Sequence, residues 1–172
     1  MREIKLKLFS YRELSEESKE RAYQEWLEDE HNIPGWADDN TESLKRITDE
    51  LMIPIKSYSL SYSEYPDRND HITLEASYYD ACNGVDEIKN IMLDRLEDYK
   101  IPYYMDDVLY EFCIKNIKLL SDKYSLNDFI DELIKTFTDA YYDDNRQHYS
   151  VENYRELAEA NDYEYLISGD LY

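Results

Sequence analysis

Alternating apolar and polar positions make residues 55–80 the clearest β-hairpin in the chain. In the first half, one face carries Tyr58, Leu60 and Tyr62, and the other face carries serines. After a turn-rich segment at 64–70, the apolar face continues through Ile72, Leu74, Ala76 and Tyr78. Such alternation is typical of antiparallel strands with one buried and one wetter face. The tyrosines expected to pack on the buried face are Tyr58, Tyr62 and Tyr78.

Apolar residues at helical spacing predict helices on both sides of this hairpin. The expected helices cover residues 15–28, 41–52, 85–96, 106–120, 125–141 and 151–160. Ser15 and Ser125 occupy N-cap positions, and Asp128 follows Ser125 in a capping-box-like arrangement. The segment 106–120 also fits a strand, but the helical template explains more of its positions.

Short alternating segments near the two ends, 2–10 and 163–167, predict terminal strands. Together with the hairpin at 55–80, they indicate an α+β fold, in which one antiparallel sheet is covered by amphipathic helices. A length of 172 residues favours a single domain over 1–172.

The net charge of the chain limits the kinds of partner that the protein can be expected to bind. The chain has 19 basic and 40 acidic residues, a net charge of −21, and the acidic excess is spread along the whole chain. Direct binding of DNA or RNA needs a basic face, and an anionic membrane surface would repel this protein for the same reason. The expected partner is instead a basic protein groove, attracted at long range.

No catalytic signature accompanies this charge. Three scattered glycines cannot form a phosphate-binding loop, and the three histidines are isolated from one another and from Cys82 and Cys113. We therefore expect no enzyme, no metal site and no cofactor, although a Cys–His pair that meets only in space stays open. The N-terminus lacks the apolar segment of a signal peptide, and no run of 18 apolar residues occurs, which favours a cytoplasmic protein.

Nineteen tyrosines are too many for one core of this size, so some are expected at the surface beside acids. Tyrosine is a favoured interface anchor, and spaced carboxylates could stand in for nucleic-acid phosphates. An acidic surface kept only for solubility remains the alternative. The candidate partner-binding residues are Glu28, Asp29, Glu30, Asp38, Asp39, Tyr104, Asp106, Asp107, Tyr142, Asp143 and Asp144.

Two stretches resemble a family of small acidic proteins common in bacteriophages and mobile elements. The opening strand and the segment Glu13–Ala22 (ELSEESKERA) resemble the strand and "ELSEEAKEKA" helix with which those proteins begin. The ending, Ala160–Leu166 (ANDYEYL) with Gly169 shortly after, is similar to the closing strand of the family. The middle of the chain differs from the family, because residues 64–70 occupy the place where such proteins often have a glycine-rich turn. The resemblance transfers no functional residue.

This resemblance implies an anti-CRISPR type of inhibitor with a Cas9-like target, and some family members carry an antitoxin-type label. Combined with the charge, it predicts an inhibitor that mimics nucleic acid and occludes the basic groove of a Cas9-type or restriction-type nuclease. The alternative is an antitoxin-like or adaptor module that binds one protein through an apolar groove.

Overall fold

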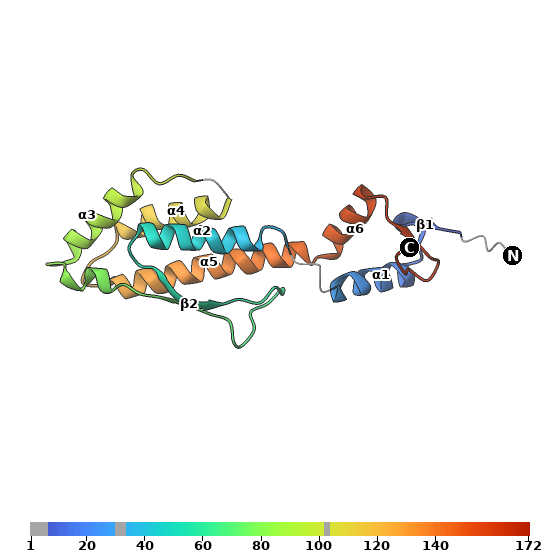
Figure 1. Ribbon diagram of the computed structural model, residues 1–172, viewed down its shortest axis with the longest axis horizontal. Coiled ribbons are helices and arrows are strands. Elements are labelled where there is room, and N and C mark those ends of the chain that lie inside the picture. The colour runs from blue at the N-terminus through green and yellow to red at the C-terminus, as the bar shows by residue number, and fades with distance from the viewer. Residues whose placement is uncertain (1–6, 30–33, 102–103) are drawn as a thin grey trace. The chain divides into compact units, whose positions relative to one another are not determined.

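The computed structural model describes residues 7–29, 34–101 and 104–172 (Figure 1). The chain forms two compact units, which are described separately. Unit 1 comprises Met1–Pro34 and Asn145–Tyr172, and unit 2 comprises Gly35–Asp144. The expected single domain over 1–172 stays a prediction.

Unit 2 is built from helices that pack their apolar stripes together beside a hairpin. Its elements are α2 (Ala37–Glu50), β2 (Ile55–Ser59), β3 (His71–Leu74), the 3-10 helix η2 (Ser77–Ala81), α3 (Val85–Leu96), α4 (Tyr104–Ile117) and α5 (Leu126–His148), of which the residues from Asn145 on belong to unit 1. Fully buried residues of four helices form the core, including Ile47, Met92, Leu109, Leu133 and Phe137. The helices predicted in this unit are confirmed, including the ambiguous segment from 106 onward.

The start of α5 follows the predicted capping chemistry. The Asp128 carboxylate accepts from the Ser125 backbone N–H at 2.8 Å and from its hydroxyl at 2.7 Å, while Ser125 Oγ accepts from the Asp128 N–H at 3.2 Å. The helix then continues to His148, past the expected end at Tyr141. No glycine or proline interrupts this stretch, so the backbone hydrogen bonding continues.

The hairpin is confirmed as antiparallel, but its strands are short. Tyr58 pairs with Ile72, and a β-bulge lies between Ile55 and Ser57. Because of the extra residue in the bulge, Ile55 and Tyr58 both turn toward the helices although three positions separate them.

The expected burial of three hairpin tyrosines is wrong. Tyr58, Tyr62 and Tyr78 are 56%, 45% and 46% exposed. β2 ends at Ser59, before Tyr62, and Tyr78 lies in η2 rather than in a strand. The tight 3-10 turn places the neighbouring Tyr79 in the core, where its hydroxyl donates to the Leu51 carbonyl at 2.6 Å.

Unit 1 joins the two ends of the chain. Its elements are β1 (Phe9–Ser10), the 3-10 helix η1 (Tyr11–Glu13), α1 (Glu16–Glu28), α6 (Val151–Ala160) and β4 (Glu164–Tyr165). Phe9 pairs with Tyr165 across the antiparallel β1–β4 ladder. Its core is rich in buried aromatic rings, and the Tyr154 and Tyr165 hydroxyls lie 2.9 Å apart. Most of the expected first strand, residues 2–6, lies outside the described residues.

The α+β class is confirmed: 59% of the described residues are helical and 10% are extended. The expectation that the hairpin and the terminal strands form a single sheet is wrong, because they form two separate two-stranded sheets. The hairpin packs its apolar face on the helices of unit 2, whereas the terminal strands pair with each other beside the aromatic core of unit 1.

Candidate functional site

Several predicted contact residues lie on three helices of unit 2 that are joined by side-chain hydrogen bonds. Asn40 of α2 donates from Nδ2 to the Asp144 carboxylate of α5 at 3.1 Å, and Ser43 Oγ donates to Asp106 of α4 at 3.0 Å. The first bond joins the first turn of α2 to α5 at Asp144, and the second joins α2 further along to the first turn of α4. We call the exposed predicted residues there the acidic end: Asp38, Asp39, Tyr104, Asp107 and Asp143.

Asp106, expected on the same contact face, is instead fully buried. Its carboxylate accepts hydrogen bonds from Arg46 Nη2 at 2.7 Å, from the Tyr99 hydroxyl at 2.6 Å and from Ser43 Oγ at 3.0 Å. Burial alone would raise its pKa, but these bonds and the Arg46 charge outweigh burial and hold the pKa of Asp106 below its usual range. Asp106 therefore fixes the first turn of α4 to α2 and is not a surface contact.

Tyr142, expected as an exposed anchor, is also buried. Its hydroxyl donates to the Asp70 carboxylate in the hairpin loop, and burial together with this bond raises the pKa of Tyr142 to about 12. Asp144 is half-buried, and burial raises its pKa, an effect to which the neighbouring Asp143 adds. Tyr142 thus ties α5 to the hairpin loop, and Asp144 ties it to α2.

The remaining candidates belong to unit 1. Glu28 is the last residue of α1 and Asp29 its C-cap, and both are exposed. Glu30 lies outside the described residues. Of the predicted site, the structure thus brings together only the part carried by α2, α4 and α5.

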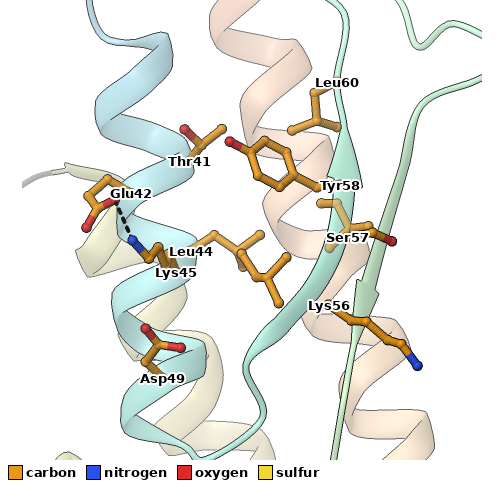
Figure 2. A pocket seen from close by; sticks show the side chains of 11 residues that line it. Thr41, Glu42, Leu44, Lys45, Asp49, Lys56, Ser57, Tyr58 and Leu60 are labelled. Atoms are coloured by element: carbon orange, nitrogen blue, oxygen red, sulfur yellow. Dashed lines mark ion pairs between the residues drawn. The ribbon is translucent and has the colours of Figure 1, made fainter.

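A second feature, not expected at a specific place from the sequence, is a groove of about 520 Å³ between α2 and β2 (Figure 2). Leu44 of α2 and Ile55, Leu60 and Ile72 of the hairpin form its apolar surface. Tyr58 extends from β2 toward α2, with its hydroxyl on the side of Thr41 (Figure 2). The period-two pattern had placed Tyr58, Leu60 and Ile72 on one face, but it could not show that α2 leaves that face partly open.

Charged residues line both banks of this α2–β2 groove. On α2, Lys45 Nζ lies 3.7 Å from the Glu42 carboxylate, and Asp49 is exposed one turn further along. On β2, the Lys56 side chain points away from α2 (Figure 2). The groove therefore combines an apolar floor with banks that carry two acids and two lysines.

A metal-binding cluster and a membrane-spanning helix are two features that the described part of the chain does not contain. Within it, no group of three or more His, Cys, Asp or Glu side chains is placed to hold a metal ion. In the same ranges, no helix has both the length and the apolar character needed to cross a bilayer. Comparison with protein-family models, with curated proteins and with solved structures finds no match. The resemblance to the phage-type family stays a prediction.

Proposed function

We propose that this protein inhibits a nucleic-acid-binding defence enzyme of the bacterial host by occluding its basic groove. The observation that carries the proposal is the net charge of −21, displayed in part by exposed carboxylates on α2, α4 and α5. A protein that holds polyanions presents the opposite potential, so the acidic end is complementary to it.

The proposed mechanism uses the carboxylates as surrogates for phosphates. Asp38 and Asp39 sit in the first turn of α2, Asp107 in that of α4 and Asp143 near the end of α5. Each exposed pair would add only roughly 0.2–1 kcal/mol, so the group acts together and mainly speeds association. Tyr104, 71% exposed at the start of α4, supplies an aromatic contact beside these charges.

The proposed target is a Cas9-type or restriction-type nuclease, acted on in the cytoplasm of the host cell. The family resemblance supports the phage or mobile-element origin, and the acidic surface supports a target with a Lys- and Arg-rich channel. The proposed activity is binding alone, without catalysis and without a cofactor.

The test compares two variants with equal net charge. In the first, Asp38, Asp39, Asp107 and Asp143 become asparagine; in the control, four exposed acids elsewhere on unit 2 become the matching amides. The control positions are Asp80, Glu97, Asp122 and Asp131. Inhibition of DNA cleavage by guide-loaded Cas9 and by restriction nucleases is measured at fixed salt. The first variant should lose inhibition by roughly tenfold or more, while the control stays close to the wild type. Equal losses in both variants, or no inhibition by the wild type, would contradict the proposal.

The groove supports a second candidate, an antitoxin-like or adaptor module without nucleic-acid mimicry. The observation in its favour is the half-exposed Tyr58 above the apolar floor of the α2–β2 groove. Salt separates the two functions, because electrostatic docking weakens steeply with ionic strength and apolar docking does not. Binding to a captured target should therefore be measured from about 50 mM to about 500 mM NaCl.

A further inference from the structure

We infer that the α2–β2 groove binds an extended, basic segment of a partner protein, which adds to β2 as a new strand. None of the acidic-end residues lines this groove, and the inference does not depend on nucleic-acid mimicry. It rests on the free edge of β2, on the apolar floor and on the charge of the molecule.

The free edge supplies the backbone hydrogen bonds. In the described part of the chain, β2 pairs with β3 and with no other strand, so β3 occupies one edge only. Figure 2 shows β2 between α2 and β3, and the consecutive residues Ile55 to Tyr58 line the groove. The unpaired N–H and C=O groups of such an edge are a template for an added strand.

The bulge limits the register of that strand. It lies between Ile55 and Ser57, so regular pairing with β2 can begin only at Ser57. Lys56 in the bulge points away from α2 (Figure 2) and leaves the groove open. The usable edge runs to Leu60, about 13 Å of extended chain. A segment of about four residues would fill it.

The floor selects alternate side chains of the added segment. Leu44 is buried, Ile55, Leu60 and Ile72 are half-buried, and Tyr58 is 56% exposed above them. In an extended segment, every second side chain faces the same way. Apolar side chains of the segment would thus meet the floor and the Tyr58 ring, while its other side chains meet solvent and the helix bank.

The charge of the whole molecule, together with one exposed acid of the groove, favours one of the possible occupants. On the α2 bank, Lys45 is engaged by Glu42 at 3.7 Å, which leaves Asp49 exposed to a positively charged side chain. A second copy of this chain, paired edge to edge, would bring together two molecules of net charge −21. That repulsion opposes self-pairing, whereas the same potential attracts a Lys- or Arg-rich segment.

The probe for this inference is a capped decapeptide of alternating lysine and valine. A second peptide carries N-methyl groups on its central residues, which removes the backbone donors from both edges but keeps the side chains. Binding to the full chain is measured by amide NMR shifts and by titration at about 150 mM salt. The lysine–valine peptide should shift the amides of residues 57–60, and methylation should weaken binding at least about tenfold.

A pair of variants with equal charge serves as the control. Tyr58→Lys places a cation in the groove, whereas Tyr65→Lys makes the same change at a 65% exposed residue of the hairpin loop. We expect Tyr58→Lys to weaken peptide binding about tenfold and Tyr65→Lys less than about twofold. Equal affinity for the methylated peptide, or equal losses in both variants, would overturn the inference. The methylated peptide tests the wild-type protein, so this outcome does not depend on the folding of a variant.

The same assays distinguish this inference from the proposed inhibition. The variant with four asparagines at the acidic end should bind the peptide as tightly as its matched-charge control, even if that variant no longer inhibits a nuclease. Loss of peptide binding in the acidic-end variant but not in the control would overturn the assignment to the groove.

Discussion

At the scale of single residues, the largest surprise is the different fate of two neighbouring aspartates. Asp106 is buried and ion-paired, while Asp107 is exposed. Successive residues of a helix point about 100° apart, so identical side chains can face core and solvent. Among forty acids, composition gives no reason to choose Asp106. The usable signal is spacing, because Asp106 continues the stripe of Leu109 and Cys113 one turn earlier.

The first prediction concerns the buried ion pair. Asp106→Asn should lower the free energy of unfolding by about 2–3 kcal/mol, because it removes the charge that Arg46, Tyr99 and Ser43 surround. Urea denaturation at about pH 7 measures the effect. Asp107→Asn is the matched control and should change stability by less than about 0.5 kcal/mol. Similar values for the two variants would show that the network contributes little.

The same residue predicts a pH dependence with a defined sign. The folded pKa of Asp106 lies below that of an unfolded aspartate, about 3.9. The unfolded state therefore binds the proton more readily, and the stabilisation is lost as the pH falls through the folded pKa. The difference in unfolding free energy between wild type and Asp106→Asn should be constant from about pH 7 to 5 and shrink below about pH 4. A difference that grows on acidification would contradict the assigned ionisation.

At the scale of elements, regular helices were predictable and short irregular turns were not. Ser15 accepts from the Ser18 N–H as expected of an N-cap, and the Ser125–Asp128 box begins α5. Both follow from local sequence alone. The 3-10 turn η2, which buries Tyr79 in place of Tyr78, follows from tertiary packing that no period-two pattern contains.

The groove shows the same limit for the candidate site. Its strand residues were assigned to one face by alternation, yet the opening above them depends on where α2 lies and on the bulge next to Ile55. Bulges insert one residue and carry no strong sequence signature here, since the residue involved is an ordinary lysine. Sequence therefore predicted the apolar face of the hairpin but not the accessible part of it.

A tight contact between the C-terminal segment and α1 yields an element-scale prediction in unit 1. Gly169 has φ +102°, and a Cβ there would lie 2.2 Å from the Ser18 carbonyl oxygen. The Ser18 hydroxyl donates to the Ile167 carbonyl at 2.7 Å, so this segment is held against the helix. Gly169→Ala should lower the free energy of unfolding by roughly 1–3 kcal/mol or more, because it combines backbone strain with overlap.

Gly35→Ala supplies the control for that substitution. A Cβ at Gly35 meets nothing within 4 Å, and its backbone is outside the left-handed region. The free energy of unfolding of Gly35→Ala should stay within about 1 kcal/mol of the wild-type value. Thermal unfolding followed by tyrosine absorbance compares the two variants, and an unchanged Gly169→Ala would show that the C-terminal segment does not pack against α1 as described.

At the scale of the whole chain, the net charge follows directly from the residue counts and does not depend on the fold. The sheet arrangement does depend on the fold. The sequence could not predict that the terminal strands and the hairpin form separate sheets, because a strand of two residues such as β1 is too short to specify its pairing partner. The function proposed from the charge depends on this scale, because exposed carboxylates act on a partner through their summed potential.

The net charge also predicts how salt changes stability. Exposed ion pairs such as Lys135–Asp139 are weakened by salt, but each contributes only about 0–1 kcal/mol. Repulsion among the excess carboxylates acts over the whole surface, and screening relieves it as the Debye length falls from about 30 Å at 0.01 M to about 10 Å at 0.1 M. With a net charge of −21, repulsion should outweigh the pairs. Raising NaCl from about 10 mM to about 300 mM should therefore stabilise the protein by about 1 kcal/mol, a Tm increase of about 2–4 °C measured by calorimetry. A Tm that falls over this range would mean that attractive ion pairs, and not repulsion among the excess carboxylates, dominate the effect of salt on stability.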